Sequence, residues 1–247
     1  MGWLEEIAKA LPIKEIYQDA AQPAVKQVGQ ALERTVKTAR FVLAPVEYIA
    51  AQYVRWERYL ERVSEKVPEE NLIEADPQIA GPVFENLRYA KEDSLIAEMF
   101  LNLLARAIDK ERVHEAHPAI GHIIGQLHPD EAIILFFLKQ RQYSLQEKSK
   151  YNRENNTLSP RTEVKNDFPL DRLAFPQNFR IYLDHLYSLN LVWLRQAGNQ
   201  VPTYDEGTEN QNGVIINNVA ELMGFGFVFA SACIPEKLPS EIIENNT

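Results

Sequence analysis

The spacing of apolar residues along the first half of the chain predicts α-helices. Apolar side chains recur there every three or four positions, which places them on one side of a helix. The pattern predicts a short helix over residues 3–11, ended by Pro12, and then a long helical arm. Alanine dominates the first part of the apolar stripe over residues 13–39, and small side chains let a second helix approach closely. We therefore expect the arm to pack against another helix.

The arm continues through residues 41–54, its most apolar part. This stretch has 14 residues, too few to cross a bilayer and typical of a buried helix. Two other interpretations stay open: the stretch could lie flat on a membrane surface, or it could form an interface between copies of the chain. The polar residues 56–67 end the arm, and their charge pattern is typical of a solvated helix face.

The best patterned stretch runs from Leu72 to Lys139 and predicts the packed centre of the protein. Helices are expected over residues 83–90, 95–108 and 129–139. Asp76 precedes Pro77 and should be extended, while Ser94 is placed to cap the second helix. The run Ala132–Leu138 is apolar nearly all round, so we expect it to be buried.

Four histidines in this region raise the possibility of a metal site, and they are His114, His117, His122 and His128. Their spacing argues against it, because Pro118 interrupts any helix that would align the first two, and no cysteine or His-Glu-x-x-His pairing is present. His117–Pro118 and His128–Pro129 are instead typical of helix starts. We expect capping and packing roles for the histidines.

Residues 144–169 are polar and rich in Asn, Ser and charge, which predicts a long loop inserted between elements. Its basic residues and one aromatic residue could contact nucleic acid, and they are Lys148, Lys150, Tyr151, Arg153, Arg161 and Lys165. Four carboxylates dilute this charge, namely Glu147, Glu154, Glu163 and Asp167. The sequence therefore favours a solvated loop.

The C-terminal part predicts a helix over residues 177–190, a strand after it, a hairpin with a turn at Asn212–Gly213, and a final apolar helix. With the helix at residues 129–139, this order is that of a winged helix. The predicted fold is thus mainly α: a long helical arm on a helical core over residues 1–127, and a small winged-helix-like α+β module over residues 128–247 with the loop insertion at about 144–169.

Composition narrows the possible functions. The net charge is −9, which disfavours binding to nucleic acid or to an anionic membrane unless a local basic patch overrides it. Cys233 is the single cysteine, so the chain has no internal disulfide, and its apolar surroundings predict a buried thiol. No signal peptide is predicted, and a cytoplasmic location is expected.

Several phrases resemble the bacterial abortive infection alpha family, and the similarity covers most of the chain. They include I-Y-Q-D-A-A-Q-P-A-V-K-Q-V-G-Q-A-L, P-E-E-N-L-I-E-A-D-P-Q-I-A-G-P, M-F-L-N-L-L-A-R-A-I-D and H-P-A-I-G-H-I-I-G-Q-L-H-P-D-E-A-I-I-L. The resemblance implies a role in defence against phage and supplies no catalytic residues. Before their last helix, family members tend to have a sequence similar to threonine–proline–any residue–glycine. Residues Leu222–Gly226 of this chain depart from it.

These observations favour a non-enzymatic defence protein that acts through protein–protein contacts or self-association. No nucleophile, base or phosphate-binding loop is tied together by spacing, so we expect no catalytic, cofactor-binding or metal-ligating residues and no small-molecule substrate. Two alternatives remain: a membrane-active effector that uses residues 41–54, and a DNA-associated regulator that uses the winged module. The second is disfavoured, because the helix over residues 177–190 carries only Arg180 beside Asp184 and His185.

Overall fold

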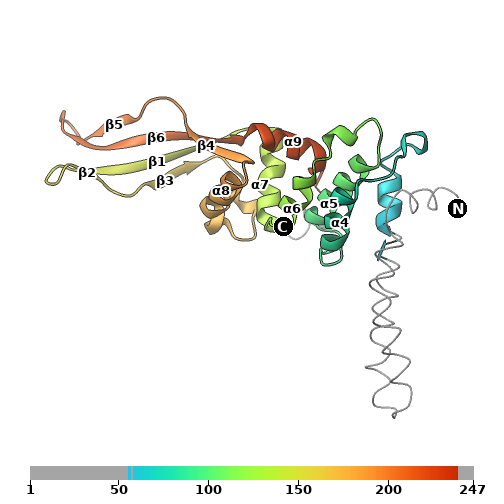
Figure 1. Ribbon diagram of the computed structural model, residues 1–247. Helices are drawn as coiled ribbons and strands as arrows, with labels where there is room; N and C mark the ends of the chain where they lie inside the picture. The colour runs from blue at the N-terminus through green and yellow to red at the C-terminus, as the bar shows by residue number, and fades with distance from the viewer. Residues whose placement is uncertain (1–54, 57, 239–247) are drawn as a thin grey trace, which may run out of the picture. The chain divides into compact units, whose positions relative to one another are not determined.

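The computed structural model describes residues 55, 56 and 58–238 (Figure 1). The chain divides into two compact units between Gln126 and Leu127. The predictions for the helices over residues 3–11, 13–39 and 41–54 lie outside the described residues.

The first unit is helical. Its helices are α4 (Pro77–Leu87), α5 (Leu95–Ala107) and α6 (Pro118–Ile124), with 3-10 turns at Glu69–Asn71 and Val113–Glu115. Asp76 is extended as predicted, and its carboxylate also caps α4 by accepting a hydrogen bond from the amide of Gln78, 2.8 Å away. Ser94 caps α5 in the same way. The predicted helix over residues 83–90 starts earlier and ends earlier than expected, since Pro77 occupies the first turn and Pro82 is accommodated inside α4.

The centre of this unit is α5. Ten of its residues are buried, including Met99, Phe100, Leu103 and Leu104. Both α4 and α6 pack on it, and Gly121 of α6 lies against Pro82 and Leu103. A Cβ atom at Gly121 would be in ordinary van der Waals contact with these side chains, at 3.6 and 3.7 Å.

The helical residues 58–64 and their flanks carry the face predicted to be solvated. Glu61 and Glu65 of that face are exposed, whereas the basic residues beside it make contacts. Arg58 forms an ion pair with Glu92, and Arg62 and Lys66 both bind the carboxylate of Glu98 on α5. Arg55 donates to the carbonyl oxygens of Arg88 and Ala90 and to the hydroxyl of the buried Tyr59. The basic side chains therefore fasten this helix to the turn between α4 and α5.

The second unit combines three helices with a sheet. The helices are α7 (Pro129–Gln140), α8 (Phe179–Ser188) and α9 (Gly224–Cys233). The strands are β1 (Tyr143–Asn152), β2 (Thr157–Leu158), β3 (Thr162–Asn166), β4 (Val192–Gln196), β5 (Val201–Tyr204) and β6 (Gln211–Leu222).

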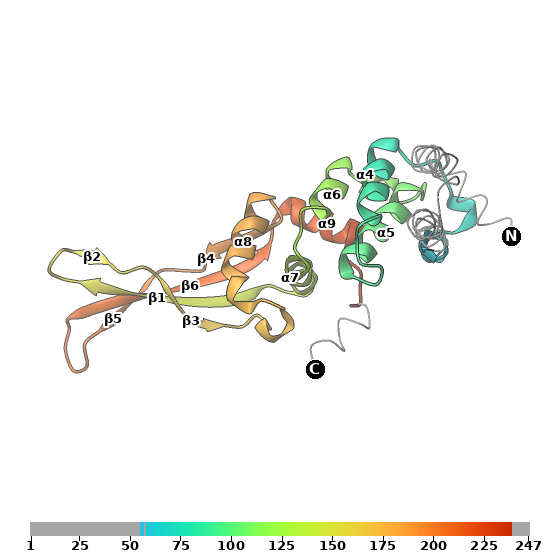
Figure 2. The same cartoon turned by 90° about the horizontal axis from the view of Figure 1, so that it is seen from below.

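Two long antiparallel strands, β1 and β6, form the middle of the sheet, with Tyr143 opposite Ala220 and Lys150 opposite Gly213. Both β2 and β3 pair with the outer edge of β1, and both β4 and β5 pair with the outer edge of β6. All pairings are antiparallel. Figures 1 and 2 both show the far ends of β1 and β6, with β2 and β5, running well beyond the helices of the same unit.

The predicted fold class, mainly α with a small winged-helix module, is wrong. The second unit contains a six-stranded antiparallel sheet. Residues 144–169, predicted as a loop insertion, form most of β1 together with β2 and β3. A winged helix requires a compact cluster of helices before its strands, and here three strands separate α7 from α8.

The reason for the error lies in the inward positions of β1. Leu145 is followed at two-residue steps by Glu147 and Ser149, and all three are buried. A strand with polar residues on its buried side does not show the apolar alternation by which strands are recognised. The turn prediction at Asn212–Gly213 is also wrong, because both residues lie inside β6. The hairpin turns instead around Gly207, whose φ of 72° suits glycine.

Other predictions for this region are confirmed. The helix over residues 177–190 corresponds to α8, and α7 begins at the His128–Pro129 entry. Cys233 is buried, and its thiol lies 3.0 Å from the carbonyl oxygen of Phe229.

Candidate interaction surface

The four histidines lie at helix starts and on the surface. His117 and His128 are the N-cap residues of α6 and α7, and each Nδ1 accepts a backbone amide hydrogen bond. His114 and His122 are exposed. Within residues 55–238 as described, no group of three or more histidine, cysteine, aspartate and glutamate residues is arranged to hold a metal ion.

A buried network of carboxylates joins α7 to α8. Glu131, 2% exposed, accepts the backbone amide of His128 and lies 2.7 Å from Nδ1 of His185. Asp130, 1% exposed, accepts the amides of Ala174 and Phe175 just before α8, at 2.8 and 2.9 Å. The sequence indicated favourable first-turn charges here and did not indicate that they are buried. Their contacts fix the position of α8 relative to α7.

The network also affects Tyr182 of α8. Burial raises the pKa of its phenol, and the nearby Asp130 carboxylate raises it further. Its ring stacks on the His128 imidazole, with ring centres 5.1 Å apart. The carboxylates of Asp130 and Glu131 thus hold helices together, which is the ordinary role of buried polar networks.

An aromatic cluster holds the helices against one side of the sheet. Phe168, which follows β3, contacts Phe137 of α7, Tyr143 of β1 and Phe179 of α8, with ring centres 4.8 to 5.6 Å apart. We call this side of the sheet the covered face. Side chains alternate between the two sides of a strand, and directly paired residues point to the same side.

The covered face includes one carboxylate from the mixed-charge segment, Glu147. It is 8% exposed, accepts a 2.7 Å hydrogen bond from Asn218 of β6, and lies within 3.4 Å of Arg161 and 3.2 Å of Arg180. Arg180 is the one Lys or Arg residue of the helix that the DNA hypothesis depends on, and it thus contacts a carboxylate on strand β1. Arg161 of the predicted loop does the same.

The opposite side of the sheet is here called the open face. Its side chains follow from the register of the strand pairs: Ser144, Gln146, Lys148 and Lys150 of β1, Thr162 and Lys165 of β3, Trp193 and Arg195 of β4, Val201, Thr203 and Tyr204 of β5, and Gln211, Ile215, Asn217, Val219 and Glu221 of β6. Val219 is buried, and the others are exposed or half-buried. Trp193 and Val201 are each 49% exposed.

The charge of the open face is opposite to that of the whole chain. It carries Lys148, Lys150, Lys165 and Arg195, and one carboxylate, Glu221. Arg195 donates to both oxygens of Glu221, and this contact raises the pKa of the arginine. The alternation of the strand thus separates charges that are mixed in the sequence: Glu147 lies on the covered face and Lys148 on the open face.

Both edges of the sheet are poorly suited to accept a further strand. In the pairing of β3 with β1, Val164 is an extra residue that forms a bulge, because Lys165 pairs with Gln146 and Glu163 with Glu147. On the other edge, residues 197–200 separate β4 from β5, and β5 contains Pro202, which has no amide hydrogen. Bulges and edge prolines hinder strand addition. A partner is therefore more readily accommodated on the open face than on the edges.

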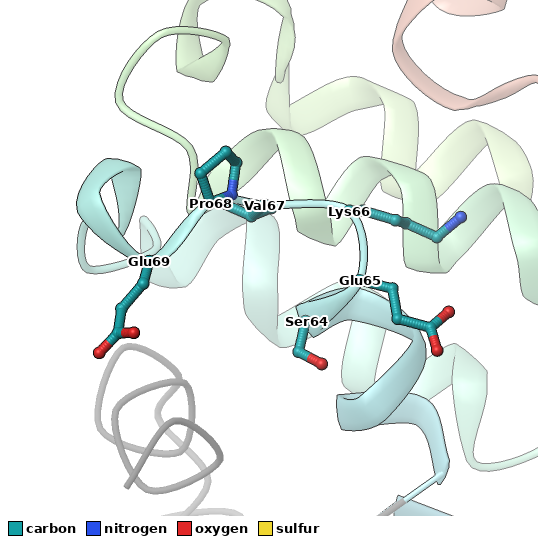
Figure 3. Close-up of a pocket in the computed structure, with 6 residues that line it drawn as sticks. All are labelled: Ser64, Glu65, Lys66, Val67, Pro68 and Glu69. Carbon is teal, nitrogen blue, oxygen red and sulfur yellow. The ribbon is translucent and has the colours of Figure 1, made fainter.

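A shallow hollow also occurs in the first unit, lined by Ser64–Glu69 (Figure 3). The side chains of Glu65 and Glu69 point away from one another, and those of Pro68 and Val67 are apolar. The hollow presents no converging set of polar groups of the kind that orients a small ligand.

Comparison with known proteins adds a family. A sequence model described as abortive infection alpha matches residues 51–233, which is most of the chain. No curated protein and no solved structure matches the chain. Among the described residues, no helix is long and apolar enough to cross a membrane.

Proposed function

Because the chain belongs to the abortive infection alpha family, we propose that it is a non-enzymatic protein of phage defence that binds a protein partner through the open face. The cytoplasm is the compartment in which we expect it to act, as phage components accumulate there. The family supports the role in defence, and the choice of surface rests on the structure of the sheet.

The observation that carries the choice is the uneven covering of the two faces. The covered face packs against α7 and α8 and contains the aromatic cluster around Phe168. The side chains of the open face, from five strands, are exposed or half-buried except that of Val219. The open face exposes Trp193 and Val201, with Ile215 half-buried beside Val201. Exposed apolar groups framed by polar side chains are typical of protein interfaces.

The other two hypotheses from the sequence have no such support. The membrane hypothesis depends on residues 41–54, which lie outside the described residues. The DNA hypothesis depended on a winged helix, and the sheet contradicts that fold.

The experiment measures phage plating on cells that express the full chain. We expect wild-type protein to lower plating, and the double variant Val201→Ser, Ile215→Thr to abolish this protection, since it removes the apolar centre of the open face. The matched control is Ile181→Thr with Tyr187→Ser, two exposed positions of α8 away from that face. The choice of surface fails if the open-face variant protects as well as wild type. The defence role fails if wild-type protein does not alter plating of any phage tested.

A further inference from the structure

The three lysines of the open face suggest the chemistry of the partner. We propose that Lys148, Lys150 and Lys165 bind an extended acidic segment of a partner protein, in which aspartate or glutamate occupies alternate positions. This inference rests on the proposed function, because it specifies what the open face recognises.

The first argument is geometric. Lys148 and Lys150 are two residues apart on one strand, so their stems are about 7 Å apart and point the same way. Lys165 lies on the neighbouring strand opposite Gln146, so it is offset from the row of Lys148 and Lys150 by one strand spacing, about 4.8 Å. An extended peptide repeats its side chains on one side at the same spacing of about 7 Å. Alternate carboxylates of such a peptide therefore match the spacing of Lys148 and Lys150, with Lys165 to one side of the peptide.

The second argument concerns the partners of these lysines within the chain. Lys165 lies 3.2 Å from Asp167, just beyond the end of β3. Within the described residues, the ammonium groups of Lys148 and Lys150 form no ion pair and no hydrogen bond with another protein group. Only their backbone atoms bond to side chains, those of Thr162 and Ser159. The carboxylate next to them in sequence, Glu147, is turned to the covered face and bound there by Asn218. Two ammonium groups on one strand thus remain available for a ligand.

The third argument concerns the net charge. The whole chain carries −9, which repels a long polyanion. At physiological salt, screening reduces charge interactions beyond about 8 Å. A short acidic segment lying on the open face therefore interacts mainly with the lysines and little with distant carboxylates.

Nucleic acid fits the face less well. Platforms for single strands combine basic residues with aromatic side chains on which bases stack. The open face has two aromatic residues. Trp193 pairs with Glu221, six positions along β6 from the residue opposite Lys148, which is about 20 Å. Tyr204 pairs with Gln211, two positions from the residue opposite Lys150, so a single aromatic side chain near the lysines is available for stacking. The polar groups around the lysines are instead amides and hydroxyls such as Gln146, Asn217 and Thr162, which suit a peptide backbone.

The test uses the purified full chain and a fluorescent peptide of alternating glutamate and threonine, with binding followed by anisotropy at about 0.1 M salt, where the screening length is about 10 Å. We expect the triple variant Lys148→Gln, Lys150→Gln, Lys165→Gln to bind at least about tenfold more weakly than wild type. Glutamine is uncharged and only one atom shorter than lysine, and the three positions are exposed or half-buried, so the fold should persist. Circular dichroism checks this.

The matched control is Lys91→Gln, Lys110→Gln, Lys237→Gln, which removes the same charge from exposed lysines elsewhere. It should bind the peptide like wild type. Equal binding by wild type and the open-face variant would overturn the inference. So would tighter binding to an oligothymidylate of about 16 nucleotides than to the peptide, since that length suits a single-strand site.

Phage plating separates this inference from the proposed function. If the apolar variant at Val201 and Ile215 loses protection while the triple lysine variant retains it, the open face is an interface but its partner is not recognised through acidic groups. If both lose protection and the peptide binds through the lysines, both proposals hold. If neither variant loses protection, the open face is not the working surface.

Discussion

Glu147 and Lys148 are neighbours in the chain and lie on opposite faces of the sheet. The carboxylate of Glu147 is buried with Asn218, Arg161 and Arg180, whereas Lys148 points to the open face. The separation follows from the two-residue repeat of a β-strand. As a result, the carboxylate of Glu147 is paired with arginines on the covered face, whereas the lysines next to it in sequence lie on the open face.

The first prediction concerns this cluster. Glu147→Gln removes the charge that Arg161 and Arg180 contact while preserving the size of the side chain. Hydrogen bonds to charged groups contribute more than neutral ones, so we expect a loss of about 1–3 kcal/mol in the free energy of unfolding. Urea unfolding measures it. Glu163→Gln, at an exposed position on β3, is the control and should cost less than about 0.5 kcal/mol. Equal effects of the two variants would show that burial of Glu147 is not important.

The second prediction concerns the start of α8. In Asp130→Asn, one of the two oxygens that accept the amides of Ala174 and Phe175 is replaced by an NH2 group, so one partly buried amide loses its acceptor. We expect a cost of about 1–3 kcal/mol. Hydrogen exchange should be faster in residues 173–188 in particular. Asp184→Asn is the control, since that carboxylate is 72% exposed and faces solvent. Unchanged exchange in Asp130→Asn would contradict the role given to this carboxylate.

The third prediction concerns pH. Burial of Glu98 opposes its ionisation, but hydrogen bonds and charge from Lys66 and Arg62 outweigh burial and lower its pKa. A carboxyl group whose pKa is lower in the folded state contributes stability above its unfolded pKa of about 4.3. That contribution is lost as the pH falls through the folded pKa. Wild-type protein should therefore lose protection of α5 amides in acid.

The variant Glu98→Gln should be less stable than wild type at neutral pH and should lose less on acidification. Hydrogen exchange in α5, measured at neutral pH and below pH 4, checks both points. Glu85→Gln on the exposed side of α4 is the control and should behave like wild type. A variant with the same acid sensitivity as wild type would show that Glu98 does not account for it.

The fourth prediction compares two glycines of α9. A Cβ atom at Gly226 would lie 2.0 Å from the carbonyl oxygen of Leu191, whereas at Gly224 it would meet nothing within 4 Å. Gly226→Ala must displace the backbone and should cost about 1–3 kcal/mol. Gly224→Ala should be neutral or stabilising by up to about 1 kcal/mol, because alanine favours the helix. Thermal unfolding measures both. A melting temperature for Gly226→Ala at or above that of Gly224→Ala would contradict the close packing of α9 on Leu191.

Much of the helical structure follows from local signals. The caps at Ser94 and His128 and the apolar repeat of α5 are properties of a few neighbouring residues, and the structure confirms them. The positions of α7, α8 and β4 were likewise indicated. Local hydrogen bonds and the helical repeat are sufficient for these predictions, since they depend little on what the helix packs against.

The sequence pattern did not predict the strands in residues 144–169, and the reason is physical. The buried side of β1 carries Glu147 and Ser149, and the polar groups of this side are satisfied by Asn218 of β6 and by Arg180 of α8, which are distant in sequence. No local pattern shows that such partners exist. The same holds for Asp130 and Glu131, whose acceptor atoms bind residues 44 to 54 positions away.

The sequence by itself determined the helices, their caps, the family and the buried thiol of Cys233. Tertiary structure alone decided that residues 144–169 form strands, that Glu147 is buried and that Lys148, Lys150 and Lys165 share an open face. Helix signals arise within one or two turns of chain, whereas a sheet joins strands from distant segments and assigns each side chain to a face through their register. For this protein the register therefore decides where a partner can bind.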